Sequence, residues 1–244
     1  MPEALSVHNL TKVYGNVVGV RNLSFSVREG EVYGLVGPNG SGKTTTLRIV
    51  ATLLKPTSGD VFVYGVDAVR EPLRARGLLA YLPEEAGAYR DLTGLDFIRF
   101  MLSLRARGAE LERRIADAIE ISRLGKNLSR PVRTYSKGMK RILALSVTLA
   151  SGAKLLVLDE PTSGLDVENS VYVRRLIRSA ARGGAAVLMS SHNMLEVETT
   201  CDRVGIIYRG SLMAEGSPRE LMESTSSRNL EELFMKLIGG EYGL

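Results

Sequence analysis

The chain has 244 residues, 44% of them hydrophobic and 24% charged, which is typical of a globular protein with a sizeable core. The net charge of +5 comes from scattered Lys and Arg residues, and because no basic block alternates with aromatic side chains, nucleic acid is only a minor hypothesis as a partner. The sequence has neither a signal peptide pattern at its beginning nor a run of about 18 apolar residues, so we expect a cytoplasmic chain that does not itself cross a membrane.

The first part of the chain predicts β-structure followed by a helix. Residues 4–14 and 17–27 show a rough alternation of apolar and polar side chains, which is typical of strands with one buried face. Residues 31–37, EVYGLVG, form a short apolar run that ends in glycine, and a helix is expected to start near Lys43. The expected order is therefore strand, loop and helix.

The rest of the chain first turns helical and then returns to strands. Between residues 91 and 150 the apolar positions recur with helical spacing, and two helices are expected to end at Gly108 and Gly125. Two continuous apolar runs then predict buried parallel strands. The later expected elements are strands at 155–160 and 185–191, a helix at 167–182, a hairpin at 203–216, a short helix at 217–224 and an amphipathic helix at 228–240.

The segment GPNGSGKT, from Gly37 to Thr44, matches the pattern G-x-x-x-x-G-K-[ST] between a predicted strand and a predicted helix. In this context the glycines let successive backbone N–H groups form a concave anion site at a helix N-terminus. Lys43 is expected to reach the β- and γ-phosphates of a nucleotide, and the Thr44 hydroxyl to bind Mg²⁺. The residues expected to contact the nucleotide are Gly37, Pro38, Asn39, Gly40, Ser41, Gly42, Lys43, Thr44 and Thr45.

Two adjacent acidic residues end the apolar run LLVLDE. A carboxylate at the end of a buried strand beside this phosphate cradle can hold Mg²⁺, and Asp159 is expected to do so. Glu160 is the candidate catalytic residue, because a carboxylate next to the metal-holding Asp can polarise the water that attacks the γ-phosphate. An acidic pair after a strand can also be a helix N-cap with a surface acid, and the cradle upstream favours the catalytic interpretation.

The stretch YSKGM, residues 135–139, predicts by itself only an amphipathic helix capped by Ser136. Its neighbours add a second interpretation. The cradle, YLPEE, YSKGM, LLVLDEP, SGLD and a strand ending in SSH follow one another in an order that resembles the ATP-binding subunit of ABC transporters over essentially the whole chain. YSKGM then corresponds to the LSGGQ signature of that family, with Ser136 and Gly138 retained and with Lys137 and Met139 as departures.

The resemblance implies that two subunits pack head to tail, so that the signature of one contacts ATP on the cradle of the other. It also implies that Tyr14 stacks on adenine, that His192 is the switch histidine that contacts the γ-phosphate, and that Asp166 belongs to a loop that crosses the dimer interface. Glu84 stands where the family usually has a glutamine near Mg²⁺ and the attacking water, so it is expected to be a metal ligand. Segment 85–97 would lie where the family docks its membrane partner.

The fold that the resemblance implies is α/β, with a P-loop NTPase core built on a mixed sheet, an N-terminal antiparallel β part and a helical signature subdomain. We expect a single ATP-binding domain over residues 1–240. Within it, about 1–86 and 151–224 would form the core with its β part, about 87–150 the helical subdomain, and 228–240 a C-terminal amphipathic helix.

The implied function is that of an ATP-hydrolysing motor subunit that uses ATP and Mg²⁺ and dimerises when ATP binds. Its partners would be a second ATP-binding subunit, identical or different, and a separate polytopic membrane permease that keeps the chain at the inner face of the cell membrane. The variant signature and the C-terminal segments MAEGSPREL and NLEELFMKLIGG resemble the branch of drug, antibiotic and lipid exporters.

Two alternatives remain open at this point. One is a soluble ABC ATPase that acts on nucleic acid or ribosomes, although the chain has neither two tandem cassettes nor a long coiled-coil insertion. The other is a regulatory nucleotide-binding module without turnover, against which Glu160 and His192 argue.

Overall fold

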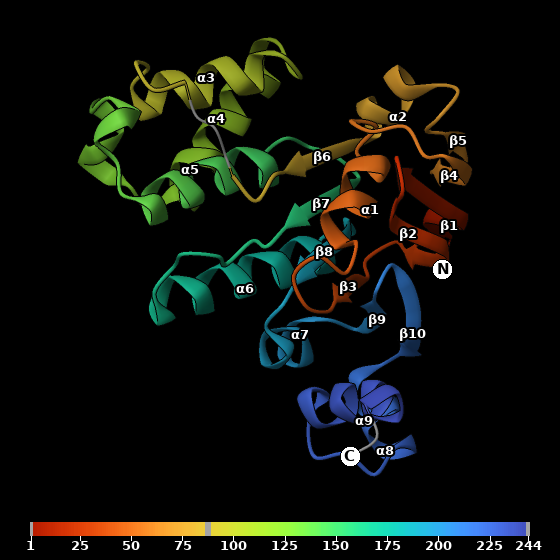
Figure 1. Cartoon of the computed structure of the whole chain (residues 1–244). Helices are drawn as coiled ribbons and strands as arrows, with labels where there is room; N and C mark the ends of the chain where they lie inside the picture. The colour runs from red at the N-terminus through yellow and green to blue at the C-terminus, as the bar shows by residue number, and fades with distance from the viewer. Residues whose placement is uncertain (1, 86–88, 243–244) are drawn as a thin grey trace.

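The computed structural model of the chain describes residues 2–85 and 89–242, and Figure 1 shows two sheets, helices that cover them and a separate group of helices. The first sheet is antiparallel and has the order β2-β1-β4-β5. Its strands are β1 (Glu3–Tyr14), β2 (Val17–Arg28), β4 (Ser58–Val63) and β5 (Val66–Asp67). β1 and β2 confirm the two predicted N-terminal strands, whereas the sequence pattern predicts neither β4 nor β5.

The second sheet has the order β10-β9-β3-β8-β7-β6, in which β9 and β10 pair antiparallel and the other neighbours pair parallel. Its strands are β3 (Val32–Val36), β6 (Leu79–Leu82), β7 (Leu155–Asp159), β8 (Ala186–Ser191), β9 (Arg203–Tyr208) and β10 (Ser211–Gly216). Every residue of β3, β7 and β8 is buried, as expected for strands covered on both faces. Because these strands run parallel, their carboxyl ends meet at one edge of the sheet.

Successive residues of the central strands pack into two different cores. In β7, Val157 lies in the core shared with α1 (Lys43–Val50) and the antiparallel sheet, whereas Leu158 lies in the core shared with α6 (Val167–Arg182) and α7 (Met194–Thr200). This alternation is the two-residue period of a strand. α1 is therefore enclosed between the two sheets, and α6 and α7 cover the opposite face (Figure 1).

A third core belongs to the helices that follow β6. They are α3 (Gly94–Ser103), α4 (Gly108–Ser122), the short 3-10 helices η1 (Gly125–Ser129) and η2 (Val132–Thr134), and α5 (Lys137–Leu149). These helices pack around buried side chains such as Phe97, Leu102, Ile115 and Leu143. We call α3, α4, η1, η2 and α5 the helical group, and they confirm the helical spacing predicted between residues 91 and 150.

The two glycines expected to end helices lie elsewhere, so that part of the prediction is wrong. α3 stops at Ser103, and Gly108 is the first residue of α4. α4 ends at Ser122, and its C-cap is Arg123, with a left-handed φ of 51°, two residues before Gly125. The guanidinium of Arg123 stacks on the ring of Tyr172 at 3.6 Å from its centroid, and this contact from α6 favours the earlier end of the helix.

α5 begins as the sequence predicts. Ser136 is its N-cap, and the Ser136 hydroxyl accepts a hydrogen bond of 3.1 Å from the Met139 N–H. The preceding residue, Tyr135, is buried and donates its hydroxyl to the carbonyl of Asn127 at 2.6 Å. The first turn of α5 is therefore fixed both by its cap and by the core of the helical group.

The C-terminal part confirms a short helix and a final amphipathic helix, α8 (Pro218–Ser224) and α9 (Leu230–Tyr242). α8 begins with a capping box of Ser217 and Glu220, and α9 buries Leu230 and Leu233 in the core that contains α7. The sequence pattern predicts neither α7 nor α2 (Pro72–Leu78). Within residues 2–85 and 89–242, no helix combines the length and the apolar character that crossing a membrane requires.

A glycine in β4 provides a test of the antiparallel sheet. Gly59 has a φ of +90°, and a Cβ atom there would lie 2.5 Å from the carbonyl oxygen of Asn9, at the point where the β1–β4 register shifts. Gly59→Ala is expected to lower the free energy of unfolding by at least about 2 kcal/mol. The alanine side chain would be strained in the left-handed backbone conformation, and its Cβ atom would clash with a backbone carbonyl that can move only at a further energetic cost. Urea unfolding followed by circular dichroism measures this.

Gly77→Ala is the matched control. Gly77 lies in α2, and a Cβ atom there would meet no atom within 4 Å, so alanine should raise the stability by about 0.5–1 kcal/mol through its helix propensity. Equal stabilities for the two variants would show that the close approach at Gly59 is not a constraint on the fold.

Candidate functional site

The phosphate cradle connects β3 to α1, as the sequence predicts. Gly42 is the N-cap residue of α1 and has a φ of 107°, and a Cβ atom at this position would lie 2.5 Å from the carbonyl oxygen of Gly19. Only glycine fits this combination of left-handed backbone and close approach. The cradle borders a cavity of about 280 Å³, which is lined by Gly19, Asn39, Gly40, Gly42, Lys43, Thr44, Thr45, Glu84 and Glu160.

Two side chains of the cradle fit a phosphate group. The Lys43 ammonium is buried and donates hydrogen bonds to the carbonyls of Gly37 at 2.7 Å and Pro38 at 3.1 Å. Burial lowers the pKa of Lys43, and the charges of Glu160 and Asp159 oppose this shift. The Ser41 hydroxyl is buried without a hydrogen-bond partner among the described residues, and such a group is normally satisfied. The cradle thus offers one cation and one unpaired hydroxyl to an anion.

Asp159 ends β7 with a fully buried carboxylate that accepts three hydrogen bonds. The donors are the hydroxyls of Ser190 at 2.6 Å, Thr44 at 3.2 Å and Tyr81 at 3.3 Å, so β8, α1 and β6 all contribute to its position. The proximity of Thr44 and Asp159 suits a hard cation that takes oxygen ligands. Among the described residues, no three His, Cys, Asp or Glu side chains are grouped so that they could hold a metal ion, so a cation here would need further oxygen ligands from phosphate or water.

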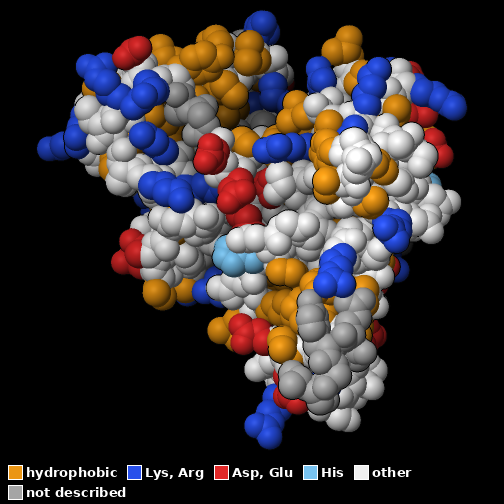
Figure 2. All heavy atoms as spheres, viewed as in Figure 1, with side chains coloured by type: hydrophobic (Ala, Val, Ile, Leu, Met, Phe, Trp, Pro, Cys, Tyr) orange, Lys and Arg blue, Asp and Glu red, His pale blue; other side chains and the backbone are white. Residues whose placement is uncertain are grey.

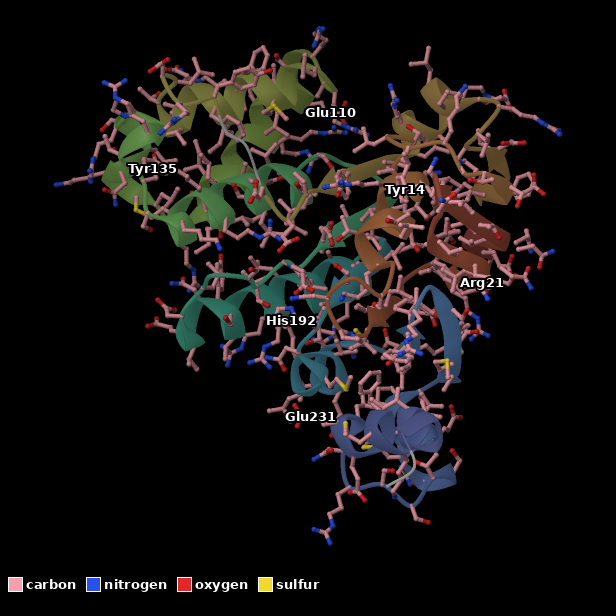
Figure 3. The ribbon with its side chains drawn as sticks, viewed as in Figure 1. Tyr14, Arg21, Glu110, Tyr135, His192 and Glu231 are labelled. Carbon is pink, nitrogen blue, oxygen red and sulfur yellow. The ribbon has the colours of Figure 1, made fainter. Side chains whose placement is uncertain are left out.

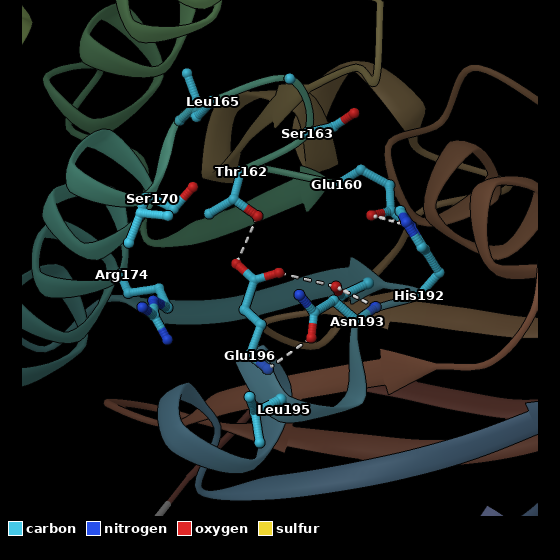
Figure 4. A pocket seen from close by; sticks show the side chains of 13 residues that line it. Glu160, Thr162, Ser163, Leu165, Ser170, Arg174, His192, Asn193, Leu195 and Glu196 are labelled. Carbon is cyan, nitrogen blue, oxygen red and sulfur yellow. Dashed lines mark hydrogen bonds and ion pairs between the residues drawn. The ribbon is translucent and has the colours of Figure 1, made fainter. Parts of the chain in front are cut away.

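Glu160 and His192 lie at the ends of neighbouring strands, β7 and β8, and their side chains meet. The His192 Nδ1 atom is 2.9 Å from the Glu160 Oε2 atom (Figure 4). Glu160 has a φ of 50°, which is uncommon for a residue with a side chain, and its N–H donates to the Ser190 hydroxyl at 3.0 Å. Burial raises the pKa of Glu160, while the hydrogen bond and charge of His192 oppose the shift. A raised pKa makes this carboxylate a stronger base than an exposed glutamate.

A second carboxylate, which sequence reasoning missed, supports both segments that flank this pair. Glu196 of α7 is buried and accepts hydrogen bonds from the Thr162 hydroxyl at 2.7 Å and the Ser191 hydroxyl at 2.9 Å, as Figure 4 shows. Thr162 follows Glu160 by two residues, and Ser191 precedes His192. Glu196 therefore joins the ends of β7 and β8 behind the catalytic candidates, but its position in a short unpredicted helix gave no sequence signal.

Glu84 and Tyr14 both lie beside the cradle. Glu84 follows β6 and lines the same cavity as Lys43 and Glu160, and Figure 2 shows acidic side chains gathered in the hollow between the helical group and the sheets. Tyr14, at the end of β1, is 45% exposed, and its hydroxyl lies 3.4 Å from the Thr45 hydroxyl. Its exposed ring is therefore available for stacking next to the cradle.

The remaining predicted residues are not near the cradle of their own chain. Ser136 caps α5 and Asp166 caps α6, where its carboxylate accepts from the Asn169 N–H at 2.8 Å. Gly138 lies against Leu165, at 3.4 Å from the position of its missing Cβ. Among the described residues, those that line the 280 Å³ cavity include none from α5 or from the loop before α6. In Figure 3 Tyr135, which precedes Ser136, lies on the left in the helical group, and Tyr14 is labelled near the middle of the view.

Arg141 is the second residue that sequence reasoning missed. An arginine on a predicted amphipathic helix is normally read as part of the solvated face, but Arg141 is only 3% exposed. Its guanidinium donates to backbone carbonyls at the ends of β6 and β7, beside Glu84 and Glu160. The sequence carries no signal for this contact, because it joins elements far apart in the chain.

Comparison with known proteins agrees with this arrangement. The family described as ABC transporter matches residues 20–163. The lantibiotic transport ATP-binding protein SrtF of Streptococcus pyogenes is 35% identical over 230 residues, which cover 94% of this chain and 95% of that protein. The daunorubicin/doxorubicin resistance ATP-binding protein DrrA of Streptomyces peucetius is 36% identical over 228 residues, which cover 93% of this chain and 69% of that protein.

A solved structure described as an ATP binding subunit of an ABC transporter superposes with a TM-score of 0.88 and 29% identity, and the match covers 96% of this chain and 99% of that chain. The mixed α/β fold with its antiparallel N-terminal sheet is thereby confirmed. The family match includes the cradle, YSKGM and LLVLDEP in one continuous segment. The chain therefore belongs to the ABC transporter family, as one of its ATP-binding, ATP-hydrolysing subunits.

Proposed function

We propose that the chain is the motor subunit of an exporter, in which ATP binding closes two ATP-binding subunits and hydrolysis lets them separate. The observation that carries this proposal is the contact of Glu160 with His192 beside the phosphate cradle, which is the arrangement that turnover needs. The names of the relatives SrtF and DrrA, which refer to lantibiotic transport and to drug resistance, support an exporter. No observation favours the alternative of an ATPase that acts on nucleic acid.

The residues at the cradle divide the work of hydrolysis. Lys43 and the loop N–H groups bind the phosphates, and Thr44 and Asp159 would hold Mg²⁺, which would neutralise charge that develops on the phosphate oxygens. Glu160 accepts a proton from the water that attacks the γ-phosphorus, the bond to the bridging oxygen breaks, and ADP leaves with that oxygen. His192 orients Glu160 through the contact at 2.9 Å. Because it lies beside Glu160, which acts as the general base, His192 also faces the γ-phosphate.

The nucleotide base and the second half of the site involve surfaces outside the cradle. Tyr14 stacks on adenine with its exposed ring. Ser136, Gly138 and Asp166 would serve the ATP of a partner subunit, which agrees with their absence from the lining of the cavity beside their own cradle. The departure at Lys137 does not block this surface, since the aliphatic part of its side chain lies over Gly164, with Cδ at 3.0 Å from the position of the missing Cβ.

The membrane partner is a polytopic permease that binds the helical group, which would keep the chain on the cytoplasmic face of the membrane. Phe100 and Leu104 of the helical group and Tyr89 before it are 40%, 64% and 57% exposed, and the rings of Tyr89 and Phe100 meet edge to face at 5.1 Å. Figure 2 shows a cluster of hydrophobic side chains on this lobe. The predicted docking segment 85–97 lies partly outside the described residues, because 86–88 are not described.

Lys43→Ala tests the cradle. The substitution removes the buried ammonium that binds phosphate, so the affinity for ATP should fall by about 100-fold or more. Isothermal titration with ATP measures this, and Lys236→Ala, which changes a lysine of α9 paired with Glu232, serves as the control with unchanged affinity. Wild-type affinity in Lys43→Ala would contradict the cradle assignment.

Glu84→Gln tests the departure from the usual residue of the family. Because the substitution keeps an oxygen ligand and removes a negative charge from the cavity of Lys43 and Glu160, the ATPase rate should be retained or rise. A steady-state phosphate-release assay measures the rate. A loss of about 100-fold would show instead that the Glu84 carboxylate takes part in proton transfer or metal binding.

Glu160→Gln with Ser136→Arg tests the composite site. Glu160→Gln should bind ATP without hydrolysing it and accumulate as a dimer, because the γ-phosphate that joins the subunits stays in place. Adding Ser136→Arg should prevent the dimer, because the larger side chain fills the space of the incoming phosphate, while each monomer still binds ATP.

Size-exclusion chromatography with light scattering, with and without ATP in the absence of Mg²⁺, distinguishes the states. The control is Ser129→Arg in the same background, because Ser129 is another exposed serine of the helical group. If Ser136→Arg dimerises as readily as this control, the start of α5 is only a capped helix.

A further inference from the structure

Arg141 lies in α5 five residues after the N-cap Ser136, a distance of about 7.5 Å along the helix axis. Its side chain is directed into the molecule and is only 3% exposed. A buried guanidinium is costly unless its N–H groups are paired. The hydrogen bonds of Arg141 therefore identify what this part of α5 is attached to.

All three nitrogens of the Arg141 guanidinium donate to backbone carbonyls, and these come from two short segments. Nη1 donates to Pro83 at 2.5 Å and to Glu84 at 3.0 Å, directly after β6. Nη2 donates to Asp159 and to Glu160, the latter at 2.5 Å, and Nε donates to Pro161 at 3.1 Å, directly after β7. One side chain thus fixes both loops that carry acidic residues of the cavity.

The Arg141 guanidinium stays charged at neutral pH in spite of its burial, because arginine is not deprotonated in proteins. Burial lowers the pKa of Arg141 to about 10, and the charges of Asp159, Glu84 and Glu160 oppose the shift. Charge-assisted hydrogen bonds are roughly twice as strong as neutral ones, so the attachment of the two loops is firm.

The backbone of Glu160 depends on such an attachment. A φ of 50° at a residue with a side chain persists only where the surroundings determine the conformation. Arg141 binds the carbonyl of Glu160 and those of the residues before and after it, while the Glu160 N–H is bound by Ser190. The direction in which the carboxylate points is therefore set by α5 as well as by β8.

We propose that Arg141 is a positioning residue for ATP hydrolysis that ties the helix beginning at Ser136 to the backbone of Glu84 and Glu160 in the same subunit. The inference rests on the proposed function, in which Ser136 contacts the ATP of the partner while Glu160 serves the ATP of its own cradle. Arg141 is then a direct mechanical link between the two composite sites. When the γ-phosphate of the partner's ATP binds at the start of α5, the same helix positions Glu160 at the ATP of its own cradle.

Arg141→Met removes the donors and keeps the length of the side chain. ATP affinity should stay within about threefold of wild type, because the cradle lies on α1, whereas kcat should fall by about 100-fold with little change in KM. Arg141→Lys keeps the charge without the planar fork and should restore part of kcat. Hydrogen exchange should quicken at residues 83–85 and 159–162 and stay unchanged at 37–45.

Arg114→Met is the matched control. Arg114 is another largely buried arginine of the helical group, which binds the Ser151 carbonyl and Glu110 and touches neither loop of the cavity. Both variants should lower the unfolding temperature, and only Arg141→Met should lower kcat when assayed well below that temperature. If Arg141→Met does not fold, wild-type kcat in Arg141→Lys overturns the proposal and a reduced kcat with unchanged ATP affinity supports it.

Three outcomes overturn the proposal: kcat of Arg141→Met within threefold of wild type, parallel losses of kcat and ATP affinity, or an equal loss of kcat in Arg114→Met. If the proposed function itself is wrong, the result differs from these three outcomes, because it is seen without any change at Arg141. In that case the wild type would not hydrolyse ATP, or Glu160→Gln would hydrolyse it at the wild-type rate.

Discussion

The parallel pairing of β3, β8 and β7 is the constraint on which the site depends. Because these strands share one direction, the chain leaves each of them at the same edge of the sheet. β3 delivers the cradle, β7 delivers Asp159 and Glu160, and β8 delivers His192. Because the three strands are completely buried, the backbone positions at their ends are fixed. The backbone therefore places Glu160 and His192 next to each other, with their side chains 2.9 Å apart.

Opposite charges lie close together at this edge of the sheet. Two buried carboxylates, Asp159 and Glu160, lie near two buried cations, Lys43 and Arg141. Burial disfavours the charged form of each group, while the opposite charges nearby favour it, as the opposed contributions to the pKa of Lys43 and of Arg141 indicate. Lys43 donates to loop carbonyls, so phosphate oxygens can replace these carbonyl oxygens without leaving a buried cation unpaired.

Sequence reasoning succeeded where the signal is local and failed where it depends on distant contacts. The buried runs of β3, β7 and β8 and the cap at Ser136 are properties of a few adjacent residues, and the structure places all of them as predicted. The end of α4 at Arg123 depends on Tyr172, the role of Arg141 on two loops, and the role of Glu196 on Thr162 and Ser191. Apart from Ser191, which is 5 residues from Glu196, these partners are 18 to 58 residues away, and no local pattern encodes them.

The two interpretations of YSKGM are compatible because of the chemistry of a hydroxyl group. The Ser136 oxygen uses one lone pair to accept from the Met139 N–H, which caps α5. The hydroxyl still has its own proton to donate and a second lone pair, so capping does not exhaust it. The cap also holds Ser136 at the exposed start of the helix, where the helix dipole favours an anion. In the proposed composite site the capped start of α5 is already arranged to receive a phosphate, and Arg141, about one and a half turns later, connects this helix to the backbone of Glu160.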